Sequence, residues 1–130
     1  MVFVSKEPEL FGDKVKISIL IDGEEVRHAH CMPEKANAVA MAQVEETIVS
    51  FTQYLIKQAP NTRHADIIQF RELFNNSLVS YEVAGNNIAL LRKHLPGGKL
   101  KYACQNKLRQ IEELVGYRKE MEASTQATRP

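Results

Sequence analysis

Residues 15–31, VKISILIDGEEVRHAHC, decide the fold that we expect for this chain. Up to Ile21 the stretch alternates apolar and mostly polar side chains with a period of two, which is typical of a half-buried strand. Asp22-Gly23 follows, a pair that favours a tight type I′ turn because both positions need positive φ. The stretch therefore predicts a β-hairpin, and the apolar residues 2–4 can add a short third strand.

The tight turn also predicts how the two strands of the hairpin pair. In a regular ladder Ile19 faces Val26, and the two histidines of the second strand then share the face of the isoleucines. Because a two-stranded hairpin is marginally stable alone, helices or a partner chain must cover its apolar face. The face expected from this register contains Val15, Ile17, Ile19, Ile21, Val26, His28 and His30.

Three helical patterns follow the hairpin. Apolar residues at three- and four-residue spacing predict a helix at about 34–58, opened by Pro33. A second pattern covers 63–95 and is interrupted by Gly85-Asn86-Asn87; it forms one kinked helix or two helices that meet at Gly85, and we favour the break. The last helix is expected at about 99–121, before a polar, frayed tail at 124–130.

The order of these elements predicts an α+β fold. An N-terminal antiparallel hairpin, with two or three strands, packs on three to four α-helices in one domain, residues 1–123. With 44% hydrophobic and 25% charged residues, the chain is not collagen-like, low-complexity or disordered. The long helices carry more apolar surface than a small sheet can cover, so we expect homodimerisation through helix faces.

The cysteines and the N-terminal residues bear on the cellular compartment. Cys31 and Cys104 lie far apart and form no short metal-binding pair. The first residues show no basic start followed by a long apolar run, and no stretch has the length of a membrane span. We therefore expect a cytoplasmic protein with reduced thiols, no membrane association and no cofactor.

Charge is distributed unevenly along the chain. Residues 1–50 contain five basic and nine acidic residues, a net charge of −4, whereas residues 51–130 have a net charge of +5. Such a split can attract a polyanion or pair two copies head to tail. One alternative function is therefore nucleic-acid binding, with phosphates held by basic side chains and a base stacked on an aromatic ring. The residues for this alternative are Arg92, Lys93, Lys99, Lys101, Tyr102, Lys107 and Arg109.

His28 and His30 suggest a second alternative. Two histidines at alternate positions of a strand point the same way and can supply two imidazoles to one divalent metal, or line a small-ligand cleft. A third metal ligand would have to come from His64, His94, Cys104 or an acidic residue, none at a recognisable spacing. The plainer interpretation is that both histidines border the apolar face of the hairpin.

Motifs for catalysis are weak. Neither cysteine nor any serine has the sequence context of a catalytic nucleophile, although two lysines flank Cys104 and could lower its pKa. Gly97-Gly98-Lys99 lacks the strand and the spacing of a phosphate-binding loop. We therefore expect no enzyme. The sequence favours a protein-interaction module, a homodimeric adaptor, inhibitor or regulator whose partner is another protein.

Overall fold

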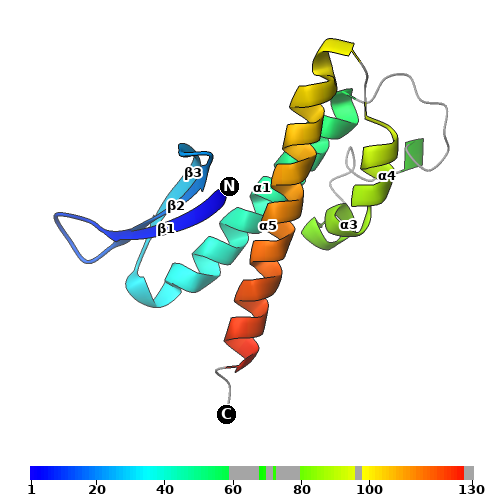
Figure 1. The fold of residues 1–130 in the computed structure, drawn as a ribbon. Helices are drawn as coiled ribbons and strands as arrows, with labels where there is room; N and C mark the ends of the chain where they lie inside the picture. Colours follow the sequence, from blue (N-terminus) through cyan, green and yellow to red (C-terminus); the bar gives the residue numbers. More distant parts are fainter. Residues whose placement is uncertain (59–67, 70–71, 73–79, 96–97, 128–130) are drawn as a thin grey trace.

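The computed structural model confirms the α+β fold, with a three-stranded antiparallel sheet at the N-terminus followed by helices (Figure 1). It describes residues 1–58, 68–69, 72, 80–95 and 98–127, and side chains as far as residue 123. No helix in these residues is both long and apolar enough to cross a membrane. The main elements are β1 (Val2–Pro8), β2 (Val15–Ile21), β3 (Glu24–Cys31), α1 (Ala36–Gln58), α3 (Tyr81–Asn86), α4 (Ile88–Lys93) and α5 (Lys101–Ala127).

The sheet has the order β1-β2-β3, which confirms the third strand expected at residues 2–4 and extends it to Pro8. The turn between β2 and β3 forms at Asp22 and Gly23 as predicted, with φ of 52° and 85°. Both angles lie in the left-handed region that this turn requires.

The predicted register of β3 is wrong beyond the turn. Leu20 pairs with Glu25, but Ile19 pairs with Arg27, so Val26 is an extra residue in a β-bulge. Because side chains alternate along a strand, the bulge moves His28 and His30 to the outer face of the sheet. The inner face instead receives Arg27, Ala29 and Cys31, opposite Ile19, Ile17 and Val15.

Helix α1 confirms the first predicted helix. A 3₁₀ turn at Pro33–Lys35 precedes it, and α1 ends at Gln58. Its buried side follows the predicted spacing, with Val44 and Ile48 fully buried. Two buried threonines, Thr47 and Thr52, donate their hydroxyl hydrogens to the carbonyl oxygens four residues earlier, which satisfies both groups inside the core.

The region predicted as a second helix is divided. Helix α3 starts after Ser80, whose Oγ accepts a hydrogen bond from the N–H of Val83 at 3.4 Å, so one continuous helix over 63–95 is wrong. The favoured break is present, but it lies at Asn87, with φ −110° and ψ 18°. Gly85 lies inside α3 and faces Val115 of α5, where a Cβ would be 3.4 Å from the valine side chain, at ordinary contact distance. The expected helix start near Arg63 lies outside the described residues.

Helix α5 is longer than the sequence predicts. A 3₁₀ turn at Gly98–Leu100 leads into it, and it continues past Met121 to Ala127. The backbone of 124–127 is thus helical, where we expected the beginning of a frayed tail. Residues 128–130 lie outside the described part of the chain.

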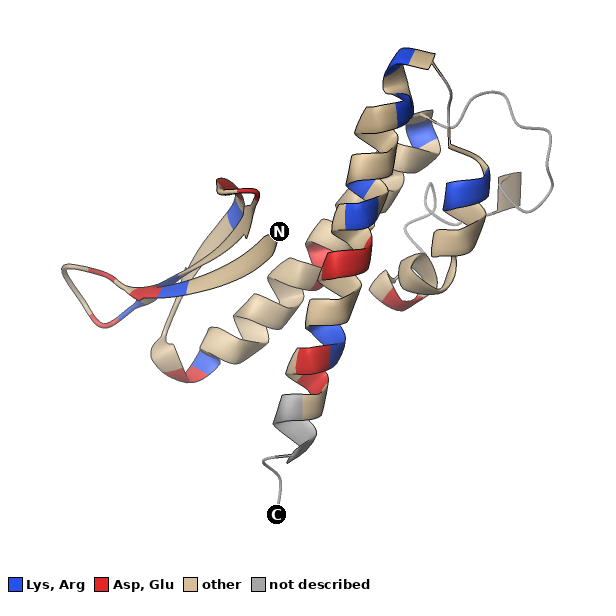
Figure 2. Cartoon of the chain, viewed as in Figure 1, with Lys and Arg blue, Asp and Glu red and all other residues tan. Residues whose placement is uncertain are grey.

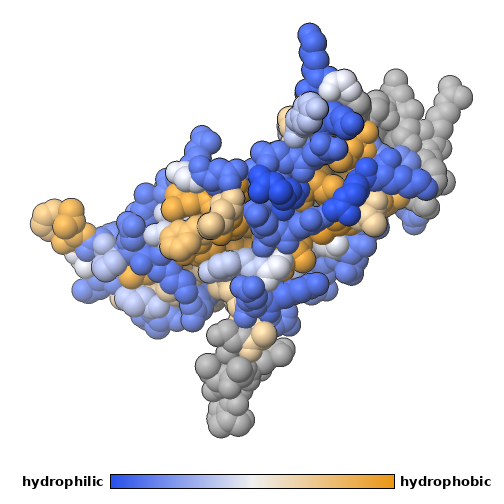
Figure 3. All heavy atoms as spheres, in the orientation of Figure 1, coloured by the Kyte–Doolittle hydropathy of each residue, from blue (hydrophilic) through white to orange (hydrophobic). Residues whose placement is uncertain are grey.

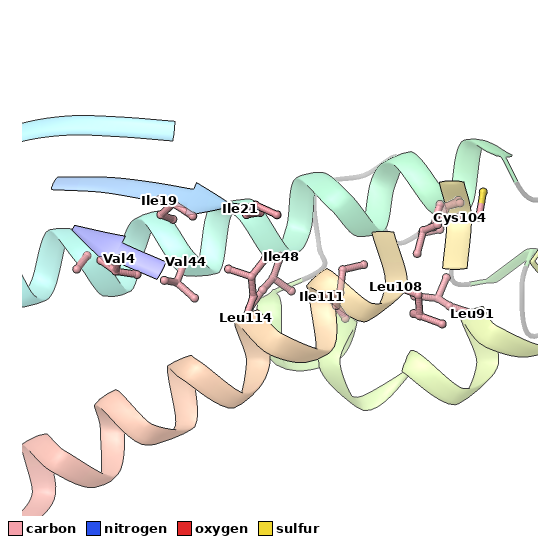
Figure 4. Packing of buried hydrophobic residues seen from close by; sticks show 14 of the residues in the cluster. Val4, Ile19, Ile21, Val44, Ile48, Leu91, Cys104, Leu108, Ile111 and Leu114 are labelled. Atoms are coloured by element: carbon pink, nitrogen blue, oxygen red, sulfur yellow. The ribbon is translucent and has the colours of Figure 1, made fainter. Parts of the chain in front are cut away.

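The core lies where α1 and α5 run side by side beneath the inner face of the sheet (Figures 1 and 4). Ile19 and Ile21 point from β2 toward α1, and Ile48 meets Ile111 and Leu114 of α5. The two long helices therefore cover each other's apolar sides within one chain. Homodimerisation through helix faces stays a prediction.

Candidate functional site

Three of the predicted basic residues come together between α4 and α5. Arg92 at the end of α4 and Lys101 and Arg109 on α5 line an open pocket of about 460 Å³. The pocket also contains two leucines, of which Leu108 is buried and Leu95 half-buried. Gln105 and Glu112 complete the lining. We call this site the basic pocket; it combines an apolar floor with a largely cationic rim.

Acidic neighbours offset two of the three cations. Arg92 forms an ion pair with Glu112. Arg109 lies 3.5 Å from Glu113 and 3.9 Å from Asp22 of the β2–β3 turn. Lys101, in contrast, makes no ion pair with any described residue. It is the cation of the basic pocket that remains available to a ligand.

The other predicted basic residues are placed elsewhere. The Nζ of Lys107 lies 3.9 Å from the ring centroid of Phe51, so it forms a cation–π contact that joins α5 to α1. Lys93, Lys99 and Tyr102 are exposed but do not line the pocket. The predicted set of seven thus contributes three residues to one site.

His28 and His30 share one face, as predicted, but it is the outer face of the sheet. Their ring centroids are 5.8 Å apart. His28 Nδ1 lies 3.5 Å from Glu25, and His30 Nδ1 contacts Glu9. In the described part of the chain no three His, Cys, Asp or Glu side chains have a metal-binding arrangement. The pair borders solvent rather than the apolar face.

The two cysteines are free thiols in different surroundings. Cys104 is fully buried, and burial raises the pKa of its thiol. The flanking lysines therefore do not activate it, because the neutral thiol is favoured inside the core. Cys31 is half-buried at the end of β3.

The sequence interpretation missed the most exposed apolar residues of the described chain. Leu10 and Phe11 are 94% and 90% exposed at the tip of the β1–β2 loop, which forms the hydrophobic end of the molecule in Figure 3. A hydrogen bond from the N–H of Glu9 to the carbonyl of Lys14, at 3.1 Å, closes this loop. Gly12 reverses the backbone with φ 103°. The signal in the sequence is two adjacent large apolar residues just before a turn glycine.

Apolar surface continues on the outer face of the sheet. Phe3 is 58% exposed and pairs with the half-buried Leu20 of β2. No described helix covers this face (Figure 1). Among the described residues, exposed large apolar side chains therefore gather on the sheet and its loop, and Tyr102 of α5 is a further one at 78% exposure.

No family model, curated protein or solved structure matches this chain.

Proposed function

We propose that this protein is a non-enzymatic protein-interaction module, an adaptor, inhibitor or regulator that works in the cytoplasm as a homo-oligomer. One observation carries the proposal: Leu10 and Phe11 project into solvent side by side at the tip of a closed loop. Exposed pairs of large apolar residues at one point of a surface are typical of interaction sites. Burying these two side chains against a partner is favourable by about 1.5–3 kcal/mol each.

The charges beside the loop define the kind of partner. Residues 7–13 contain Glu7, Glu9 and Asp13, with one lysine on each side of this segment, Lys6 and Lys14. Figure 2 shows these acidic segments at the loop end of the sheet, with basic segments beside them. These carboxylates repel an anionic membrane surface and favour a protein whose apolar pocket has a basic rim.

The strand edges support docking through the loop rather than addition of a strand. Both outer strands, β1 and β3, have an unpaired edge in the described sheet. They also carry protective residues. Pro8 ends β1, and charged side chains begin β3 at Glu24 and Glu25. Charges and proline on edge strands oppose pairing with another chain.

Site-specific photo-crosslinking tests the proposal. A photoreactive phenylalanine analogue replaces Phe11, and in a matched control it replaces Val26, which is 42% exposed at the other end of the sheet. We expect a defined crosslinked protein, identified by mass spectrometry, from position 11 only, and we expect Leu10→Ser to abolish it. Crosslinks only to lipid, no crosslink at all, or equal crosslinking from both positions would contradict the proposal.

Nucleic-acid binding is the second candidate function, because Arg92, Lys101 and Arg109 meet at the basic pocket. The absorbance at 260 and 280 nm of purified protein, followed through size-exclusion chromatography, tests it. A nucleic-acid component that high salt removes, and that Lys101→Glu prevents, would favour this function. A peak without excess 260 nm absorbance and no binding of DNA or RNA at low salt would exclude it.

A further inference from the structure

The exposed loop and the basic pocket lie at opposite ends of the molecule. In Figure 1 the β1–β2 loop projects from the far side of the sheet, whereas α4 and the start of α5 lie beyond the long helices. The loop of one chain therefore cannot reach the pocket of the same chain. Contact between these two surfaces requires two molecules.

The two surfaces are complementary in chemistry. The loop presents Leu10 and Phe11, with three acidic residues over 7–13. The basic pocket presents apolar side chains beneath a cationic rim, and its volume of about 460 Å³ leaves room for large side chains. The stretch 92–109 contains six basic residues, and the pocket lining also includes Glu112, which pairs with Arg92. An apolar tip with carboxylates beside it thus meets an apolar floor whose rim includes Lys101, the one pocket cation without an ion pair in the described residues.

We propose that the partner of the Leu10–Phe11 loop is a second copy of this chain, which receives the loop in its basic pocket. This inference rests on the proposed protein-interaction function and specifies its partner and its second surface. Lys101, which has no ion pair within the described residues, faces the acidic residues beside the incoming loop. The uneven charge of the two halves of the chain then orients the copies head to tail.

A head-to-tail contact has a consequence that a symmetric dimer lacks. Each molecule keeps a free loop at one end and a free pocket at the other, so association continues into rings or filaments. The mean mass should rise beyond that of a dimer as the protein concentration increases. Sedimentation velocity between about 10 μM and about 1 mM, the range of weak specific contacts, measures this rise.

Two variants remove the two surfaces separately. Leu10→Ser with Phe11→Ser changes the loop, and Lys101→Glu changes the pocket; all three side chains are exposed, so the fold should be unaffected. Each variant should weaken self-association by roughly tenfold or more. Val26→Ser is the control for the loop. Lys119→Glu, the same charge change on an exposed residue about 27 Å further along α5, is the control for the pocket. Both controls should associate like the unchanged protein.

A mixture of the two defective variants is the decisive experiment. The Lys101→Glu protein keeps its loop and the double-serine protein keeps its pocket, so one complementary contact forms between them. We expect heterodimers that do not grow further. A monomeric unchanged protein, association that either variant leaves intact, or a mixture that stays monomeric would each overturn the inference. A crosslink from position 11 to a different protein, with no self-association, would overturn it together with the proposed homo-oligomer, and would leave the protein-interaction module standing.

Discussion

Arg118 connects three helices through one side chain. From α5 its Nε donates a hydrogen bond to Glu45 of α1 at 2.8 Å, and its guanidinium lies 4.9 Å from the ring centroid of Tyr81 in α3. A further bond reaches Glu122 on α5 at 3.1 Å. The Arg118 side chain is 12% exposed, so water can replace few of its hydrogen bonds when a partner residue is removed. Such partly buried, charge-assisted bonds contribute more than surface ion pairs.

Arg118→Ala should therefore destabilise the protein clearly. We expect the free energy of unfolding to fall by about 1.5–3 kcal/mol, since Glu45 loses a charged partner and the contact with Tyr81 disappears. Arg118→Lys should give an intermediate loss, because an ammonium cannot reproduce the planar fork of guanidinium. Urea unfolding followed by circular dichroism measures both values.

Arg92→Ala is the matched control. The ion pair of Arg92 with Glu112 is exposed, so this variant should lose less than about 1 kcal/mol of unfolding free energy. Equal losses at the two arginines would contradict the argument.

At the scale of elements, Glu25 links the two strands of the hairpin. Its carboxylate accepts a hydrogen bond from Ser18 at 2.8 Å, lies 3.0 Å from the Nζ of Lys16, and is 3.5 Å from His28. The hydrogen bonds from Lys16 and Ser18 lower the pKa of this carboxyl below its usual value of 4.5. The ionised form is thus favoured in the folded hairpin.

This lowered pKa predicts a pH dependence of stability. A depressed folded pKa stabilises the fold above the unfolded pKa of about 4.5, and the benefit is lost as pH falls through the folded pKa. Glu25→Gln removes the ionisation. The stability advantage of the unchanged protein over this variant should therefore shrink on acidification from about pH 6 to about pH 3. Urea unfolding of both proteins at several pH values measures the difference. A stability difference that grows toward low pH would show that folding does not lower the pKa of Glu25.

The sequence correctly predicted the elements whose formation depends on residues that are close together along the chain. The Asp22-Gly23 turn forms because its backbone angles suit these residues, and α1 forms because its apolar spacing fits one buried side. The bulge at Val26 was not predictable from alternation, since a bulge adds one residue without a local breaking signal. That single residue reversed the expected orientation of both histidines. A helix break near Gly85 was predicted from the low helix propensity of Gly85 and the two asparagines after it, and the break lies at the second of these, Asn87.

At the scale of the whole molecule, counting charges predicted a basic region, but it did not predict that the basic side chains point to different sides of the molecule. Lys101 and Lys107 are near in sequence, yet one lines the basic pocket and the other packs over Phe51. The period of 3.6 residues places them on different sides of α5, so the helical pattern itself carried this information. Glu112 and Glu113 lie just beyond the basic stretch: Glu113 contacts Arg109 one helical turn earlier on α5, and Glu112 pairs with Arg92 of α4. The exposed loop was missed because two adjacent apolar residues form no periodic pattern.

The continuous core predicts that the sheet and the helices unfold together. Leu114 of α5 is fully buried and lies near Ile48 of α1, in the same apolar cluster as Ile19 of the sheet (Figure 4). Leu114→Ala leaves a cavity there and should lower the free energy of unfolding by about 2–5 kcal/mol. Leu10→Ala, at a 94% exposed position, should change it by less than about 0.5 kcal/mol.

Residue-specific NMR during urea unfolding tests this cooperativity. In both the unchanged protein and the Leu114→Ala variant, the amide signals of Ile19 and Leu55 should disappear at the same urea concentration, because one core holds both elements. The variant should shift this common midpoint to lower urea without separating the two signals. Earlier loss of the Ile19 signal would mean that the sheet is a separate cooperative unit, and that α1 and α5 hold the helical part without it.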